Sequence, residues 1–302
     1  NMKGYIKLLL VLVVMVSAHT AAFAQQNVLN AKTPDQMRAS ELTGALLPEK
    51  PMSYGYVDQR DILWSKTVWE VIDLDERINF PLYYPVDTVA LDVSRRSLYD
   101  VLVKNIKNGS LEEVYVDSYF TEKRAFEDLK ASLQKVDTTD AGYQALNAGE
   151  QVPEEYITRR DITAADIEQY LIKGMWYFDK RLGELKYRLI GLAPVAPDVN
   201  FIDDYNVDPE ENKVPLFWVW YPAARDILHN AKVFNQRNPS NPISFDMLLN
   251  ARRFNSMIYR EDNEFGDRDI KDYIVKNALF QLLESNRIKE AIRDKEQDMW
   301  SY

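Results

Sequence analysis

The sequence predicts an α+β protein in which antiparallel hairpins pack with helices behind an extended N-terminal tail. Segments that alternate apolar and charged residues are interspersed with helical segments, without the regular strand–helix–strand spacing of a parallel sheet. Four landmarks also recur in the same order in residues 57–135 and 159–302. Because ordered self-similarity indicates an internal repeat, we expect two lobes that arose by duplication.

The first 24 residues have the pattern of a secretory signal peptide. Lys3 and Lys7 form its positive region, Leu8–Val16 is apolar, and the stretch Ala22–Ala24 precedes the expected cleavage before Gln25. The apolar run is too short to cross a bilayer core of about 30 Å, and no other run approaches the required length. The pattern therefore predicts export to the periplasm without insertion into a membrane.

Composition restricts the partners and the means of stabilisation. The chain has no cysteine and forms no disulfides, and its 302 residues suffice to bury a sizeable core without them. It carries 37 basic and 47 acidic residues, and its formal charge of −10 becomes −12 when Lys3 and Lys7 leave with the signal peptide. Because nucleic acids select basic surfaces, they are not expected as partners.

Residues 25–56 form the predicted tail, because they are polar, weakly periodic and interrupted by prolines. Two interpretations stay open: a solvated leader, or a strap that becomes ordered on binding and wraps a neighbouring subunit. Leu46 and Leu47 are the candidate contact residues of such a strap. Residues 136–158 are also weakly patterned and are predicted to link lobe one (57–135) to lobe two (159–302).

The landmarks of the repeat keep a nearly constant spacing until a single jump. Trp176 lies 107 residues after Trp69, and Pro194 lies 109 residues after Pro85, whereas the later landmarks are 145 to 146 residues apart. One insertion in lobe two, at about 195–240, accounts for the difference. The later pairs are Leu98–Leu102 with Ser244–Leu248, and Tyr119 with Glu264.

Lobe one is predicted to open with a hairpin over Val68–Tyr84 that ends at Pro85. A helix follows and stops at Gly109, and a short strand at Val114–Val116 comes next. The helix is predicted from apolar residues at helical spacing, which are Leu98, Val101, Leu102 and Ile106.

Lobe two is predicted to begin with a helix that starts at the capping box Thr163–Asp166, carries Ile167, Tyr170 and Leu171 on one face, and ends at Gly174. Two strands, Met175–Phe178 and Leu185–Leu192, then form a hairpin with alternating apolar and basic residues. The remaining predicted elements are a helix from Pro222, a strand at Met257–Tyr259, a helix capped by Asp267 and a helix over Asn286–Gln297.

The chain contains few residues that could carry chemistry. His229 is the single histidine after the leader, so His-based zinc sites and cysteine nucleophiles are excluded. Acidic clusters at 203–211 and 261–269 have oxygen ligands suited to calcium, but neither fits the EF-hand register, and solvated loops are the commoner explanation. No catalytic residue, metal or cofactor is predicted, although any two carboxylates that meet in the fold could form a glycosidase pair.

The stretch FWVWYP contains the most distinctive aromatic residues, Trp218, Trp220 and Tyr221. In a strand, Trp218 and Trp220 point to the same face. Packing in the core of lobe two is one interpretation. An interface anchor is another, because tryptophan and tyrosine dominate protein–protein hot spots. A platform for stacking sugars, as in a cell-wall-binding module, is a third.

Several long runs resemble the gliding-motility protein family GldN, also called PorN. The first lobe is similar through WEVIDLDERINFPLYYP, and the second lobe through much longer stretches. The similar segments are Trp69–Pro85, Trp176–Ala196, Pro215–Leu228, Phe245–Asn263 and Asp272–Ile292. Together they extend over nearly the whole mature chain and are weakest in the tail and the linker.

The resemblance implies a non-enzymatic, periplasmic component of the type IX secretion system. A member of this family is expected to form rings beneath the outer membrane with a lipoprotein partner, GldK or PorK. It is also expected to connect to GldM or PorM, which is anchored in the inner membrane. The resemblance brings no catalytic motif and no cofactor, and a cell-wall-binding module or a carboxylate-based glycan hydrolase is the alternative.

Overall fold

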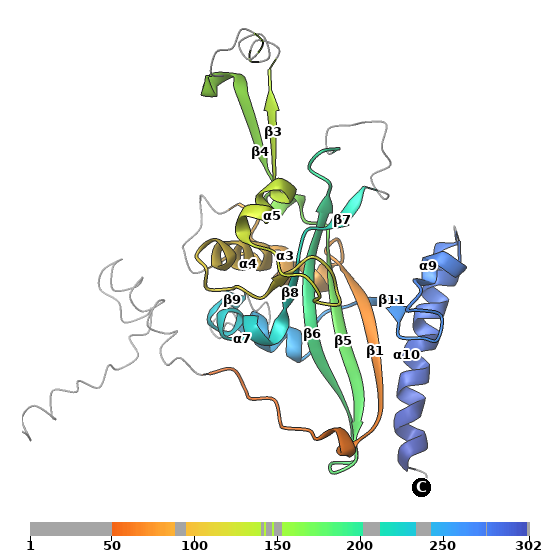
Figure 1. Ribbon diagram of the computed structural model, residues 1–302. Coiled ribbons are helices and arrows are strands. Elements are labelled where there is room, and N and C mark those ends of the chain that lie inside the picture. Colours follow the sequence, from red (N-terminus) through yellow and green to blue (C-terminus); the bar gives the residue numbers. More distant parts are fainter. Residues whose placement is uncertain are drawn as a thin grey trace, which may run out of the picture. The chain divides into compact units, whose positions relative to one another are not determined.

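The structure is a computed structural model that describes residues 50–87, 95–139, 142, 147, 153–201, 212–233, 243–275 and 277–300 (Figure 1). Residues 50–302 form one compact unit. The predicted signal peptide, the tail up to residue 49 and the acidic cluster 203–211 lie outside the described residues.

An antiparallel sheet forms the centre of this unit, which confirms the α+β class (Figure 1). Within the described residues the sheet has seven strands in the order β11-β1-β5-β6-β8-β2, and β7 pairs with the end of β6. Its strands are β1 (Ile62–Asp73), β2 (Val114–Tyr115), β5 (Gln169–Asp179), β6 (Glu184–Pro197), β7 (Lys213–Pro215), β8 (Trp218–Trp220) and β11 (Met257–Glu261).

The two predicted lobes share this sheet. β1, from predicted lobe one, pairs with β5, from predicted lobe two, between Ile62 opposite Asp179 and Asp73 opposite Gln169. The edge strands also pair across the predicted lobe boundary. β11, from predicted lobe two, pairs with β1, and β2, from predicted lobe one, pairs with β8. The linker at 136–158 therefore does not separate two sheets. The duplication itself stays a prediction.

The predicted hairpin over Val68–Tyr84 is wrong. β1 ends at Asp73, and the chain continues through a 3-10 turn (Arg77–Asn79) into the short helix α3 (Phe80–Tyr83). Asn79 stabilises this turn: its Nδ2 donates to the carbonyl of Asp73 at 2.7 Å, and its Oδ1 accepts from the Asn255 backbone at 2.9 Å. By contrast, the predicted strands 175–178 and 185–192 are confirmed as parts of the hairpin β5–β6.

The helix predicted after Thr163 is also wrong, although its capping box exists. Thr163 and Asp166 form the box, but it caps only a 3-10 turn, Ala164–Asp166. From Gln169 onward the chain is β5, with β1 paired on one side and β6 on the other. Two ladders of backbone hydrogen bonds override the local helical spacing, as tertiary context often does for sequence propensity.

Helices cover one face of the sheet around the main core. The predicted helix at Leu98 is α4 (Leu98–Lys107), and the helix predicted from Pro222 is α7 (Tyr221–Asn230), with α8 (Phe245–Asn250) beside it. α5 (Phe126–Leu133) completes this group. The buried residues of the core include Ile72, Leu98, Leu102, Ile172, Leu192, Phe217, Val219, Leu228 and Phe245.

Beyond β11, two helices complete the C-terminal part. α9 (Ile270–Tyr273) is capped by Asp269, not by the predicted Asp267, whose own backbone is left-handed with φ of 58°. The last helix, α10 (Ala278–Trp300), starts eight residues earlier than the predicted 286. Ile288 and Ile292 of α10 pack with Val68 and Ile258, which attaches this helix to the sheet.

Two short ribbons complete the described fold. Gln134–Thr138 (β3) pairs with Ile157–Asp161 (β4), so both ends of the predicted linker belong to an antiparallel ribbon that projects beside α5 (Figure 1). Its side chains are largely exposed. β9 (Lys232–Val233) and β10 (Ile243–Ser244) form the second ribbon, next to α7 and α8.

An ion pair buried in the core joins segments far apart in sequence. Glu70 on β1 is 1% exposed, and Arg252, which follows α8, donates to its two carboxylate oxygens at 3.1 and 2.7 Å. The Ser256 hydroxyl donates a further hydrogen bond to Glu70. The guanidinium of Arg252 also lies 4.2 Å from the ring centroid of Tyr187. This cluster fixes the end of α8 against β1.

We expect replacement of Gly174 by alanine to destabilise the sheet by roughly 1–3 kcal/mol, because it overpacks the core. A Cβ at Gly174 would lie 2.0 Å from the Tyr187 hydroxyl and 2.2 Å from its ring. Urea unfolding measures the change, and Gly55→Ala is the control, since a Cβ there meets nothing within 4 Å. Equal stability of the two variants would contradict the close packing of the Tyr187 ring against Gly174.

Candidate functional site

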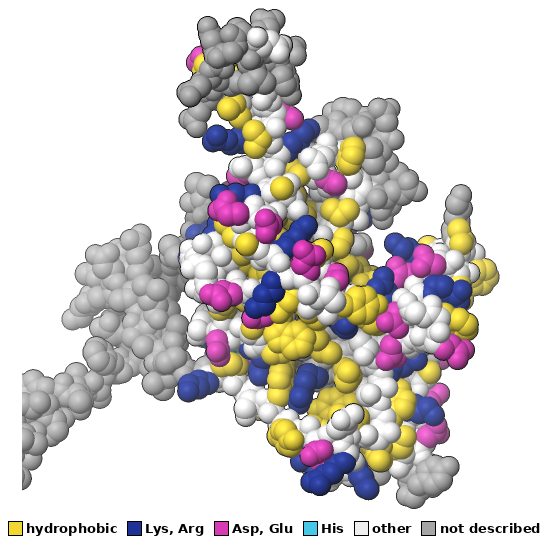
Figure 2. Space-filling view, viewed as in Figure 1, with side chains coloured by type: hydrophobic (Ala, Val, Ile, Leu, Met, Phe, Trp, Pro, Cys, Tyr) yellow, Lys and Arg dark blue, Asp and Glu magenta, His cyan; other side chains and the backbone are white. Residues whose placement is uncertain are grey.

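The face of the sheet away from the main core carries an aromatic cluster. Trp69 of β1, Ala193 of β6 and Trp218 of β8 are buried together. They lie on adjacent or nearby strands, with side chains on the same side of the pleat. Partly buried residues around them are Tyr115, Phe120, Leu171 and Tyr259. In the view of Figure 2, hydrophobic side chains gather over the middle of the sheet.

The loop after β2 covers part of this aromatic face. Phe120 adopts a left-handed backbone (φ 59°) and packs edge-on against Trp220, with 4.9 Å between ring centroids. Lys173 lies beneath the loop: its Nζ donates to the Ser118 carbonyl at 2.9 Å and lies 4.7 Å from the ring centroids of both Trp69 and Tyr119. Burial lowers the pKa of Lys173 from its ordinary value. The lysine and the aromatic rings thus fasten the loop to the sheet.

Trp218 and Trp220 lie in β8 and share this face, as predicted. Trp218 is 3% exposed, so it belongs to the aromatic cluster and offers no free surface to a partner. Trp220 is half-buried and remains a candidate contact residue. For Trp220, neither the interface role nor the sugar-stacking role is tested, and both stay predictions.

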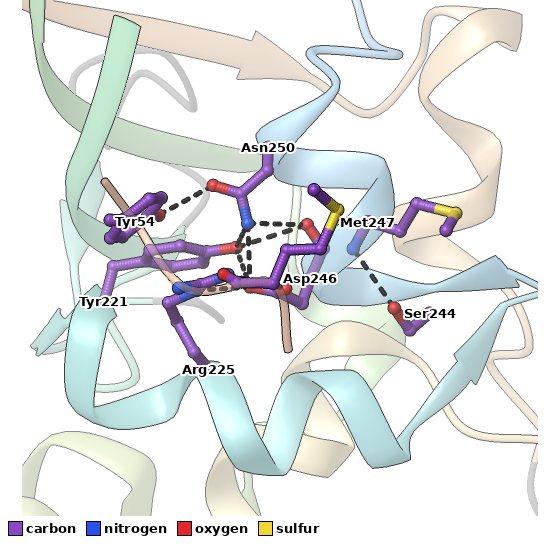
Figure 3. A network of polar contacts seen from close by, with 8 residues as sticks. Tyr54, Tyr221, Arg225, Ser244, Asp246, Met247 and Asn250 are labelled. Carbon is purple, nitrogen blue, oxygen red and sulfur yellow. Dashed lines mark hydrogen bonds and ion pairs between the residues drawn. The ribbon is translucent and has the colours of Figure 1, made fainter. Parts of the chain in front are cut away.

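Tyr221 lies on the opposite side, in the main core, which favours the predicted core interpretation of this residue over an interface anchor. It is fully buried at the start of α7, and its hydroxyl donates to Asp246 Oδ1 at 2.8 Å. Arg225 pairs with both oxygens of the same carboxylate, at 2.9 and 3.2 Å, and Asn250 donates to it at 2.8 Å (Figure 3). Burial raises the pKa of Tyr221, so its hydroxyl keeps its proton.

Residues 50–56, the described end of the predicted tail, lie on this polar network. The hydroxyl of Tyr54 donates to Asn250 at 2.7 Å, and the guanidinium of Arg225 lies 4.0 Å from the Tyr54 ring centroid (Figure 3). Arg225 also donates to the carbonyl of Met52 at 2.6 Å. This part of the tail therefore binds its own chain. Leu46 and Leu47 lie outside the described residues, so their predicted contacts stay untested.

The acidic cluster at 261–269 is engaged in contacts with neighbouring residues. Glu261 pairs with Lys66 at 2.9 Å, and Asp269 pairs with Arg260. Asp262 accepts a hydrogen bond from the Thr67 backbone, and Asp267 accepts one from Tyr119. In the part of the chain that the structure describes, no group of three or more His, Cys, Asp or Glu residues could hold a metal ion.

An exposed apolar surface spans α9 and the first two turns of α10. Its side chains are 36 to 64% exposed and belong to Tyr273, Val275, Leu279, Phe280, Leu282 and Leu283. Tyr273, Phe280 and Leu283 line an open groove of about 560 Å³, and the Glu284–Arg287 ion pair (2.6 Å) also lines it. Contiguous exposed apolar side chains with a polar rim mark interaction sites.

This α9–α10 surface was not predicted from the sequence. The stretch Ala278–Leu283 reads ALFQLL and is apolar on almost every side, whereas a helix with a single buried face alternates with polar residues. Within the described residues, the fold buries the side of Ser285, Ile288 and Ile292 and leaves Leu279, Phe280, Leu282 and Leu283 exposed. That excess of apolar residues was the signal available in the sequence.

A second cavity, of about 380 Å³, lies between α10 and the sheet, and several of the polar groups that line it have partners. It contains the Glu70–Arg252 pair, and Lys289 donates to the Ser256 carbonyl there. Desolvation lowers the pKa of Lys289. These contacts between Lys289 of α10 and the residues around Glu70 join α10 to the sheet.

These features define an α+β protein with an exposed apolar surface on its C-terminal helices. No helix among the described residues is long and apolar enough to cross a membrane. The family described as gliding motility associated protein GldN matches residues 57–301, and the chain belongs to this family. The resemblance drawn from the sequence is thereby confirmed. No curated protein matches the chain.

Proposed function

We propose that this chain is a non-enzymatic structural subunit of the type IX protein secretion and gliding-motility machinery. Membership of a gliding-motility family supports this role. The observation that carries it is the α9–α10 surface, where six apolar side chains are exposed together. A subunit that acts through protein–protein contacts needs such a surface, and burial of the surface is the driving force for assembly.

In this proposal the chain works in the periplasm, after removal of its signal peptide. It joins a ring beneath the outer membrane, together with a lipoprotein of the GldK or PorK type, and connects to an inner-membrane-anchored protein of the GldM or PorM type. Head-to-tail contacts between different surfaces close into rings when the rotation permits. The α9–α10 surface and the half-buried Trp220 are the candidate contacts on this chain.

A charged side chain at the α9–α10 surface should weaken assembly with the lipoprotein partner. We expect Phe280→Asp and Leu283→Asp each to weaken co-purification at least tenfold, because the buried contact would hold an unpaired carboxylate. Co-expression followed by affinity purification and electron microscopy measures complex formation. Leu182→Asp, in the β5–β6 turn and 55% exposed, is the matched control. Unchanged rings with both variants would exclude this surface, and failure of the unaltered chain to bind the partner would contradict the proposed function.

The alternative, a carboxylate-based glycan hydrolase or cell-wall-binding module, has less support. A hydrolase needs a carboxyl with a raised pKa paired with a second one in a cleft. Burial raises the pKa of Asp100 at the start of α4, but Asp100 does not line either of the cavities beside α10. Turnover of peptidoglycan that a single carboxylate substitution abolishes would favour this alternative.

A further inference from the structure

The cavity between α10 and the sheet has the walls of a small-ligand site. Its volume, about 380 Å³, falls near the lower end of the range of roughly 300–1,000 Å³ that is typical of such sites. Ile258 and Ile292 belong to the buried cluster that attaches α10 to the sheet, so packing fixes these walls in place. The apolar residues that line the cavity are Trp176, Leu185, Phe254, Ile258 and Ile292.

Lys289 brings a half-buried ammonium group to this cavity without a counter-charge. Its Nζ donates to the Ser256 carbonyl, and because an ammonium group has three donors, other N–H groups remain for a ligand. No ion pair within the described residues involves Lys289. Burial lowers the pKa of Lys289, which shows that its charge is held at a cost. A carboxylate bound beside it would reduce that cost.

Arg293 adds a second cation, four residues further along α10 and on the same face of the helix. It is exposed and forms no ion pair among the described residues. The carboxylate of Glu70 is already paired with Arg252. The cavity has Arg252, Lys289 and Arg293 against Glu70 and Glu296, an excess of one positive charge, although the chain as a whole carries −10. A local excess of this sign attracts an anion.

We infer that this cavity binds a ligand in which a single carboxylate is joined to a small apolar group. Lys289 and Arg293 hold the carboxylate, and the ring of Trp176 packs against the apolar group. One negative charge balances the positive excess, whereas a phosphate dianion would leave the site negative. A free carboxylic acid and the C-terminal residue of a peptide present the same two groups. The cavity and the groove of the α9–α10 surface share no lining residue, so the inference goes beyond the proposed assembly role.

Calorimetric titration of the full chain with matched acids and amides tests the site. The free-acid probe is 3-phenylpropionate, with 3-phenylpropanamide as its uncharged counterpart. The peptide probe is acetyl-Gly-Phe with a free carboxyl terminus, with its C-terminal amide as the counterpart. We expect at least one acid to bind at least tenfold more tightly than its amide, because charge-assisted hydrogen bonds are about twice as strong as neutral ones. Tighter binding of the peptide acid identifies a chain end as the ligand, and tighter binding of 3-phenylpropionate identifies a small molecule; both support the site.

Substitutions on α10 check that the cavity holds the carboxylate. Lys289→Met and Arg293→Met should each weaken binding of the acid at least tenfold and leave binding of the amide unchanged. Arg293 is exposed, so its substitution tests the site even if Lys289→Met disturbs the fold. Lys295→Met is the matched control, because Lys295 is exposed on the same helix and does not line the cavity. Equal binding of acid and amide, no binding of either acid, or full binding by both cavity variants would overturn the inference and leave the proposed function intact.

Discussion

Arg252→Met is expected to lower the free energy of unfolding by about 3–5 kcal/mol, because it leaves a buried carboxylate without its charged partner. Glu70 is 1% exposed and takes both of its close ion-pair contacts, at 3.1 and 2.7 Å, from Arg252. Ser256 donates to the same carboxylate but carries no charge. Urea unfolding, followed by far-UV circular dichroism, measures the loss. For a unit of this size it corresponds to a decrease in melting temperature of roughly 6–20 °C.

A double substitution separates the charge from the packing. Glu70→Leu combined with Arg252→Met removes both charges, and we expect it to be more stable than Arg252→Met alone, since apolar replacements of buried ion pairs are often neutral or better. Arg60→Met is the exposed control, with 82% of its side chain accessible, and should change stability by less than about 0.5 kcal/mol. If Arg252→Met were as stable as Arg60→Met, the Glu70–Arg252 ion pair would contribute nothing to the free energy of unfolding.

Asp246→Asn is expected to destabilise the chain by about 3 kcal/mol and to release the segment Met52–Tyr56. The substitution keeps the shape but removes the charge that holds Arg225, which is 8% exposed and then becomes an unpaired buried cation. Arg225 would lose the orientation in which it contacts Met52 and Tyr54. Urea unfolding reports the loss of stability, and the rate of chymotryptic cleavage after Tyr54 reports the release.

The matched control is Asp226→Asn, because Asp226 lies on the same helix, next to Arg225, and is exposed. We expect this variant to keep the stability and the cleavage rate of the unaltered chain. Destabilisation without faster cleavage would show that the segment is held independently of the network. Faster cleavage in both variants would contradict the role assigned to Asp246.

Local patterns predicted those elements whose sequence and packing agree. The helix at Leu98 has an apolar residue at each buried position and a serine cap, Ser97, so the structure confirms it as α4. The hairpin strands around Gly183 were found because apolar and charged residues alternate with a period of two. Gly183 has φ of 65°, a conformation that glycine adopts without strain and that ends such a turn.

Other predictions failed where distant segments decide the conformation. Tyr170 and Leu171 have helical spacing after a genuine capping box, yet they lie in β5 because strands on both sides supply their hydrogen bonds. The predicted division into two lobes did not anticipate that β1 would cross into the sheet of the second lobe. Neither effect leaves a trace within a window of a dozen residues, because the partner lies about 100 residues away along the chain.

By itself, the sequence determined the α+β class, the family and the scarcity of groups that could carry chemistry, because these depend on residue types and local order. Only the tertiary structure decided which aromatic residues are free. It buried Trp218 and Tyr221 on opposite sides of the sheet, left Leu279 and Phe280 exposed, and placed Tyr54 between two arginines. Whether a side chain is exposed depends on which other segments pack over it. Those segments lie more than 100 residues away along the chain.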